Sequence, residues 1–193
     1  MIVLGTNMEE IKNNNPGGLI CSLFGHRSIY KYPNLEERLL KQIEQLILLG
    51  YTIFYVGRHG DFDFIAYCCL RKIRKNYPYI KINIVFTGRE LLGRREEKGI
   101  WEDAFRDVET VYFPVEDEHF KRRITVTNQM MIDLSDVVVL LYDPFASSAG
   151  VKNAFKYAKK EGKKIINLYS EEEYLEIENK YKEKIKTDFP HLK

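Results

Sequence analysis

Apolar positions in this chain fall into two kinds of pattern that alternate along its length. Short and nearly continuous apolar runs, rich in β-branched and aromatic residues, predict buried strands. They lie at residues 19–24, 51–56, 80–86, 137–142 and 164–169, with a shorter candidate at 110–113. The run at 137–142 is the most apolar, so we expect it near the centre of a sheet.

Between these runs, apolar residues recur at the spacing of an amphipathic helix. Leu35, Leu39 and Ile43 begin one such stripe, which Gly50 ends. Asn34, followed by Glu37, predicts a capping box at its start. Further stripes lie at 62–73, 124–134 and 151–158. Strands that alternate with helices predict an α/β fold with a mostly parallel sheet and right-handed crossovers.

We expect a single domain over residues 19–170, flanked by two segments of different composition. Residues 1–18 contain a cluster of asparagine, proline and glycine, and predict either an edge strand or an arm across a neighbouring subunit. Residues 171–193 are charged and carry an apolar stripe, which predicts a helix packed on the domain. The stretch 88–118 interrupts the regular pattern and is either a lid or a solvated connection.

Composition narrows the classes of protein to consider. The 193 residues include 30 basic and 28 acidic side chains, and this near balance argues against a nucleic-acid partner. No apolar run approaches the roughly 20 residues of a membrane span, and no secretory signal opens the chain, so we expect a cytoplasmic protein without a membrane partner. In a cytoplasmic protein, we expect the three cysteines to be reduced thiols. The four histidines show no metal-ligand spacing, so we expect neither a metal nor a cofactor.

Three of the predicted strands run into polar, glycine-bearing loops, which we number in chain order as loop 1 (25–27), loop 2 (57–63) and loop 3 (143–150). The carboxyl ends of parallel strands share one edge of a sheet, and ligands of open α/β proteins bind there. In loop 1, backbone amides at Gly25 beside Arg27 favour an anion such as phosphate. The alternative is a structural turn with an exposed arginine.

Loops 2 and 3 leave more alternatives open. Gly57 and Gly60 allow a backbone to approach a ligand closely. For Asp61 and Asp63 there are three alternatives: each caps the following helix, binds a sugar hydroxyl or acts as a base. In loop 3, the serines and free amides at a helix start favour either an anion or ordinary capping. The candidate ligand-binding residues are Gly25, His26, Arg27, Gly57, Arg58, Gly60, Asp61, Asp63, Asn128, Asp143, Ser147, Ser148 and Gly150.

Taken in order, four segments resemble the SLOG superfamily, a Rossmann-like group that includes DprA and the LOG nucleotide phosphoribohydrolases. They are Phe24-Gly-His-Arg27, the turn from Gly57 to Asp63, Asn128-Gln-Met-Met-Ile-Asp-Leu-Ser-Asp136, and the helix region from Ser147 to Lys159. The pattern is most similar to the YpsA-like branch. The resemblance implies a single-domain Rossmann-like three-layer sandwich that binds a nucleotide or a nucleotide-derived, ADP-ribose-like ligand at the carboxyl ends of the strands.

One departure from that pattern bears on activity. The LOG enzymes carry a Pro-Gly-Gly-x-Gly-Thr-x-x-Glu turn with a catalytic glutamate, whereas residues 145–153 contain no carboxylate. We therefore expect a homo-oligomeric binding module. The first alternative is a hydrolase or transferase acting on an N-glycosidic bond, with Asp61 or Asp63 as the catalytic carboxylate and His26 or His59 assisting. The second alternative, by analogy to DprA, is single-stranded nucleic-acid binding.

Overall fold

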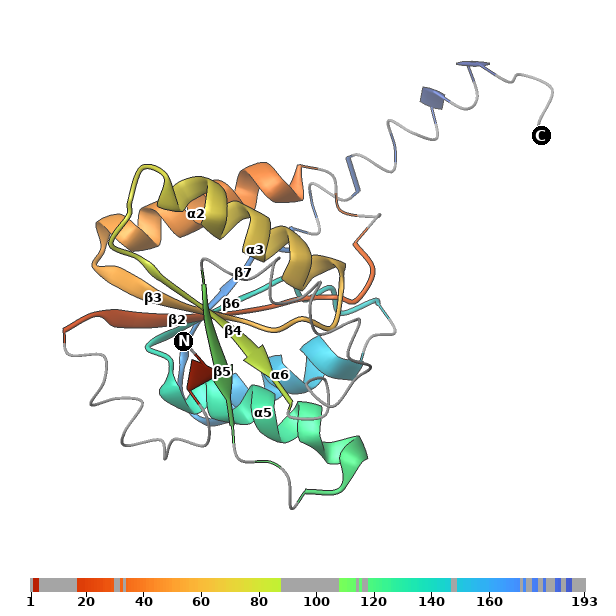
Figure 1. The fold of residues 1–193 in the computed structure, drawn as a ribbon. Coiled ribbons are helices and arrows are strands. Elements are labelled where there is room, and N and C mark those ends of the chain that lie inside the picture. Colours follow the sequence, from red (N-terminus) through yellow and green to blue (C-terminus); the bar gives the residue numbers. More distant parts are fainter. Residues whose placement is uncertain are drawn as a thin grey trace, which may run out of the picture.

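The structure is a computed structural model that describes residues 2–3, 17–29, 32, 34–87, 108–113, 115, 118–146, 149–170 and several positions between 172 and 188. Its centre is a seven-stranded sheet in the order β1-β5-β4-β3-β2-β6-β7, in which every pairing is parallel (Figure 1). The strands are β1 (Ile2–Val3), β2 (Leu19–Phe24), β3 (Tyr51–Val56), β4 (Lys81–Phe86), β5 (Glu109–Tyr112), β6 (Val137–Leu140) and β7 (Lys164–Asn167).

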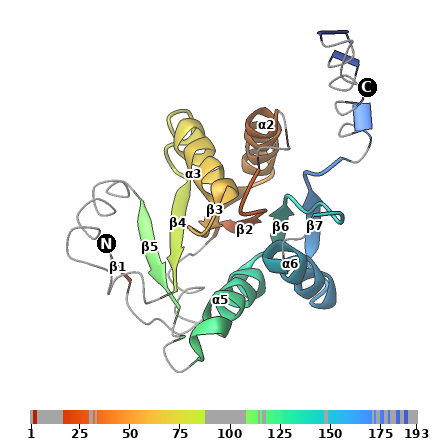
Figure 2. The same ribbon diagram turned by 90° about the vertical axis from the view of Figure 1, so that its right-hand side faces the viewer.

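Two pairs of helices enclose the sheet and make three layers (Figure 2). Helices α2 (Leu35–Leu48) and α3 (Asp61–Arg74) cover one face, and α5 (Phe120–Leu134) and α6 (Ala149–Lys160) cover the other. The predicted α/β, Rossmann-like three-layer fold is therefore confirmed. The chain runs outward from β2 through β3 and β4 to β5, then returns to place β6 on the other side of β2.

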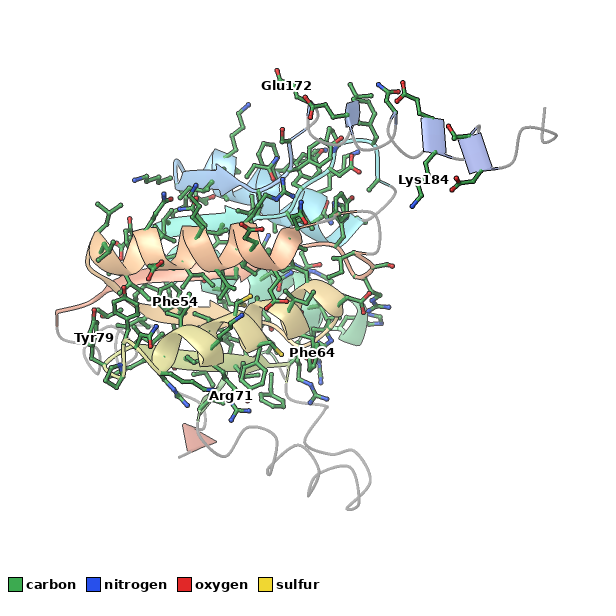
Figure 3. All side chains as sticks on the ribbon, turned by 90° about the horizontal axis from the view of Figure 1, so that it is seen from above. Phe54, Phe64, Arg71, Tyr79, Glu172 and Lys184 are labelled. Carbon is green, nitrogen blue, oxygen red and sulfur yellow. The ribbon has the colours of Figure 1, made fainter. Side chains whose placement is uncertain are left out.

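Burial on both faces explains why the strands are continuous apolar runs rather than alternating ones. In β2, Cys21 and Leu23 pack beneath α2 and α3, whereas Ile20 and Phe24 pack on the side of α5 and α6. Phe54 of β3 is fully buried beneath α2 and α3, while Phe64 on the outer face of α3 is 68% exposed (Figure 3). The two cores thus lie on opposite faces of the same strands.

The predicted capping box at α2 is wrong. Asn34 precedes the helix in a left-handed conformation, with a φ of 56°, and its side chain makes no capping hydrogen bond. The end of the helix follows the prediction, because Gly50 adopts a φ of 92°, which glycine tolerates better than other residues.

The segment between α5 and β6 ties these elements to β2. The Asp136 carboxylate accepts a hydrogen bond from the Ile20 N–H at 2.7 Å, and the Asp136 N–H donates to the Ile20 carbonyl at 2.9 Å. The buried hydroxyls of Ser22 and Ser135 lie 2.6 Å apart, and both contact the Met131 carbonyl. The Ser-Asp pair that ends the predicted α5 segment therefore fixes α5 and β6 against β2.

Removing the Asp136 carboxylate tests this connection. Asp136→Ala leaves the Ile20 N–H without its acceptor, and we expect the free energy of unfolding to fall by about 1–3 kcal/mol, the usual cost of leaving a buried donor without a partner. Asp136→Asn keeps an acceptor oxygen and should lose less. Urea unfolding followed by circular dichroism measures both variants, and equal stability of the alanine variant and the wild type would contradict the assignment.

The flanking segments are described only in part. The opening residues contribute β1, an edge strand beside β5. Residues 88–107 of the predicted excursion lie outside the described residues, whereas its later part forms β5 and places Phe113 and Val115 in the core. The described positions of the last segment, including Glu172 and Lys184, are exposed (Figure 3). Packing of that segment on the domain stays a prediction.

No helix among the described residues is long and apolar enough to cross a membrane. The three cysteines are free thiols, of which Cys21 and Cys69 are buried. Burial raises the pKa of Cys69 to about 12, so this thiol stays protonated at neutral pH.

Candidate functional site

A cavity of about 430 Å³ lies at the carboxyl ends of β2 and β3. It faces the point where the chain order reverses between β2 and β6, which is where open α/β sheets bind ligands. Its lining comes from loops 1 and 2 and from the facing parts of α5 and α6. The lining residues are Phe24, Gly25, Arg27, Gly57, His59, Gly60, Asp63, Ile124, Asn128, Gly150 and Val151.

Loops 1 and 2 pack against each other at the mouth of this cavity, and two glycines make that contact possible. A Cβ at Gly25 would collide with the buried ring of Phe62, and a Cβ at Gly60 would lie 2.7 Å from the Arg27 Cα. The Asp61 N–H donates to the Arg27 carbonyl at 2.9 Å. These glycines therefore hold the two loops together, in addition to lining the cavity as predicted.

The two candidate carboxylates of loop 2 lie in different environments. Asp61 is the first residue of α3, is exposed and does not line the cavity. Asp63 lines it, and its Oδ2 accepts a hydrogen bond from the His59 N–H at 2.7 Å. A Cβ at Gly57 would lie 2.8 Å from the same oxygen, so this glycine leaves room for the carboxylate.

The protonation of Asp63 is perturbed by its surroundings. Burial raises the pKa of this carboxyl above its ordinary value, and the hydrogen bonds and charges of His59, Gly60 and Arg27 offset part of that effect. A carboxyl group with a raised pKa on a cavity wall is a common feature of functional sites. Asp63 is therefore the stronger of the two predicted catalytic candidates.

His26 and Asp143, both predicted to bind ligand, contact each other and do not line the cavity. They are 3% and 5% exposed. The Asp143 N–H donates to His26 Nε2 at 2.9 Å, and the Tyr32 hydroxyl donates to Asp143 Oδ2 at 2.8 Å. The Tyr32 ring stacks on His26 with a centroid separation of 5.7 Å. Neither side chain lines the cavity, and the hydrogen bond from Asp143 to His26 joins loop 3 to loop 1.

The remaining candidates divide among three locations. Gly150 and Asn128 line the cavity, from the start of α6 and the inner face of α5. Arg58 does not line it, because its guanidinium lies 4.8 Å from the ring centre of Phe86. Ser147 and Ser148 lie outside the described residues.

Sequence reasoning missed three apolar lining residues, Phe24, Ile124 and Val151. Ile124 lies one helical turn before Asn128, so the spacing of these two residues on α5 was an available signal. Phe24 ends β2 and Val151 is buried at the start of α6, where both also serve the core. Their apolar character gave no sign of a second role.

The electrostatics of the cavity favour an anion near one wall. The amino-terminal ends of α3 and α6 both border it, and the partial positive charge at a helix start attracts negative charge. Among the described lining residues, Arg27 supplies the arginine charge and Asp63 the only carboxylate. No group of three or more histidine, cysteine, aspartate or glutamate side chains in the described part of the chain is placed to hold a metal.

Comparisons with known proteins identify the fold. No protein-family model and no curated protein sequence matches this chain. Among solved structures it is similar to DNA processing protein A (DprA) from Streptococcus pneumoniae, with a TM-score of 0.55 and 17% sequence identity. The match covers 77% of this chain and 49% of that protein, so the chain spans about half the length of the protein it matches. The chain therefore has a DprA-like fold.

Proposed function

We propose that this chain binds a nucleotide or a nucleotide-derived, ADP-ribose-like ligand in the cavity at the carboxyl ends of β2 and β3. The observation that carries the proposal is the convergence of Arg27 and two helix starts on a single cavity that also holds Asp63. A volume of about 430 Å³ lies within the usual range for small-molecule sites. Membership of the YpsA-like branch, the oligomeric state and the cytoplasmic location stay predictions.

The lining suggests how such a ligand is oriented. Phosphate oxygens lie beside the Arg27 guanidinium and the amides at Gly150 and Val151, because these groups donate hydrogen bonds and carry positive charge. Sugar hydroxyls lie beside Asp63, whose carboxylate accepts hydrogen bonds. His26 and Asp143 act indirectly by fixing loops 1 and 3.

Arg27→Ala tests the proposal directly. Isothermal titration of the wild type with AMP, ADP-ribose and ribose 5-phosphate should show binding, and the variant should bind about tenfold to a hundredfold more weakly, since hydrogen bonds to charged groups contribute about 1.5–3 kcal/mol. Arg27 is exposed, so circular dichroism should show an unchanged fold.

Arg58→Ala is the matched control. It removes an arginine from the neighbouring loop 2, and the Arg58 side chain does not line the cavity. Its affinity should equal that of the wild type. Undiminished affinity in Arg27→Ala would contradict the proposed phosphate contact, and a wild type that binds none of these compounds would contradict the proposed function. A single-stranded oligonucleotide belongs in the same titration, because the structural neighbour is named for DNA processing.

A second candidate function, hydrolysis of an N-glycosidic bond, is favoured by Asp63 alone. A carboxyl group with a raised pKa suits a general acid or base, and Asp63 lies on the cavity wall beside the expected sugar position. Chromatography of the titrated samples distinguishes the two functions. Intact nucleotide supports a binding module, and free base with sugar phosphate supports a hydrolase.

A further inference from the structure

A second, narrower groove runs between α5 and α6 and joins the site cavity. Its volume is about 50 Å³, and it shares Ile124, Asn128 and Gly150 with the larger cavity. The other residues that line it are Thr125, Gln129, Ile132, Asn153, Ala154 and Tyr157. A ligand in the cavity could therefore extend into this groove without crossing the sheet.

The chemistry of the groove differs from that of the cavity. Asn128 and Gln129 of α5 face Asn153 of α6, and each side-chain amide offers both a donor and an acceptor. Ile132 and Ala154 are almost completely buried and add an apolar surface. None of the described lining residues is charged, so the groove suits a neutral group with an apolar face and mixed hydrogen-bonding atoms along its edge.

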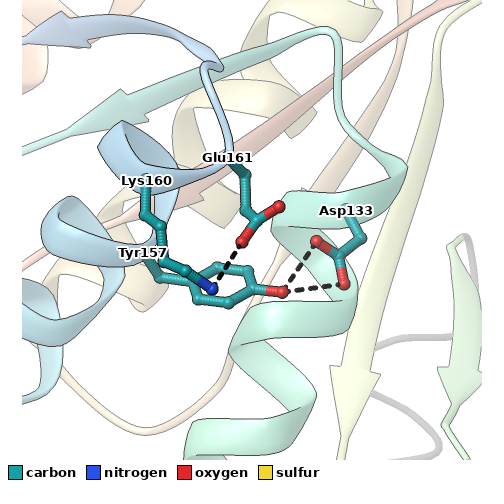
Figure 4. Close-up of polar contacts among 4 residues, drawn as sticks. All are labelled: Asp133, Tyr157, Lys160 and Glu161. Carbon is teal, nitrogen blue, oxygen red and sulfur yellow. Dashed lines mark hydrogen bonds and ion pairs between the residues drawn. The ribbon is translucent and has the colours of Figure 1, made fainter.

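Tyr157 lines the groove and is held in place by a neighbour. Its hydroxyl donates to the Asp133 carboxylate, whose oxygens lie 3.0 and 3.2 Å away (Figure 4). Lys160 lies close to the same ring and pairs with Glu161 at 3.2 Å. Burial and the adjacent Asp133 raise the pKa of Tyr157 to about 12, so the ring remains neutral. The tyrosine thus adds a fixed, uncharged aromatic surface.

We propose that this groove between α5 and α6 receives the edge of the nucleobase of a nucleotide whose phosphate lies beside Arg27. Amide side chains recognise bases because their donors and acceptors match those on a base edge. At about 50 Å³, the groove is much smaller than the adjoining cavity of about 430 Å³, so the groove suits the edge of a planar ring and the cavity suits the sugar phosphate. This inference rests on the proposed function and adds the residues that sense the base.

Asn153→Leu tests the inference, because leucine keeps a similar size and removes the amide. Asn153 is exposed on α6, so the fold should tolerate the change. Isothermal titration compares AMP, GMP, CMP and UMP with ribose 5-phosphate, which lacks a base. We expect the variant to bind its preferred nucleotide about tenfold more weakly, while its affinity for ribose 5-phosphate is unchanged. Gln129→Leu on the opposite wall should act in the same direction.

Lys159→Leu is the control, because it also exposes a leucine on α6 but does not line the groove. Three results would overturn the inference: unchanged nucleotide affinity in both groove variants, an equal loss for ribose 5-phosphate, or a wild type that binds ribose 5-phosphate as tightly as any nucleotide. In each of these cases the cavity still binds a sugar phosphate and the proposed function survives. If the wild type binds none of these five compounds and does not bind ADP-ribose either, the proposed function and this inference fail together.

Discussion

Gly25→Ala is expected to lower the free energy of unfolding by about 1–3 kcal/mol, the usual cost of forcing extra volume into a packed core. The added methyl group would overlap the ring of Phe62, which is fully buried. The ring lies in the core shared with α2 and α3, so it cannot move without displacing other packed side chains. Urea unfolding measures the loss.

Two comparisons identify the cause of this loss. Gly150→Ala should be neutral or slightly stabilising, because a Cβ there meets no atom within 4 Å and alanine favours a helix over glycine. Phe62→Ala combined with Gly25→Ala should cost less than the sum of the two single changes, because alanine lacks the Cγ and Cδ atoms that the added methyl group would meet. Wild-type stability of Gly25→Ala would show that this contact is not tight.

The strands were predictable from the sequence because both faces of the sheet are covered. In β3, all residues except Thr52 are buried, so the apolar run and the strand coincide at Tyr51–Val56. The run at 137–142 is longer than the strand it contains, Val137–Leu140, because Leu141 and Tyr142 continue into loop 3. An apolar run reports burial, and Leu141 is fully buried although it lies one residue beyond the strand.

The location of the cavity was also predictable, since parallel strands end at one edge. The orientation of each side chain in the loops was not. Asp61 and Asp63 are two residues apart in one helical turn, yet only Asp63 points into the cavity. Two residues of a helix that are two positions apart point about 200° apart, so only one of this pair can face the cavity. Which one does depends on how α3 begins against loop 1, where Gly60 lies close to Arg27. Local sequence does not record such a contact.

The roles of His26 and Asp143 show the same limit. Polar residues at strand ends suggest ligand contacts, but the His26 ring accepts a hydrogen bond from the Asp143 N–H across a sequence separation of 117. A buried polar group requires a hydrogen-bond partner, and a partner so distant in the chain cannot be inferred from either loop alone. Among the described residues, the cavity is therefore lined by only some of the predicted candidates, and His26 and Asp143 are not among them.

Asp63→Asn is expected to change how both stability and binding depend on pH. The folded-state pKa of Asp63 is raised above its unfolded value, so the contribution of this carboxyl to stability is fully present below the unfolded pKa and is lost as pH rises through the folded pKa. Asparagine has no such titration and still offers an oxygen to the His59 N–H. Relative to the wild type, the variant should gain stability as pH rises from about 4 upward.

Urea unfolding at a series of pH values measures this difference. The quantity that matters is the free energy of unfolding of Asp63→Asn minus that of the wild type, because titrations shared by both proteins cancel. Asp61→Asn is the matched control, because it removes a carboxylate from the same helical turn. Asp61 is exposed and does not line the cavity. Parallel pH curves for Asp63→Asn and the wild type would contradict a raised pKa at this position.

The same variant separates the two candidate functions when nucleotide is present. A bound phosphate adds negative charge near Asp63 and raises its pKa further, so binding to the wild type takes up a proton and weakens as pH rises. In a binding module, the affinity of Asp63→Asn for an anionic nucleotide should therefore vary less with pH than the affinity of the wild type. At neutral pH the variant should bind the nucleotide at least as tightly as the wild type, because the repulsion between the carboxylate and the phosphate is removed. A weaker affinity at neutral pH would show that the lost contact with the sugar outweighs this repulsion. In a hydrolase, the variant should release product about a hundredfold to ten-thousandfold more slowly, because a positioned acid or base contributes that much to the rate. Retained binding without any product from the wild type would exclude the catalytic role and leave Asp63 as a group that couples nucleotide affinity to pH.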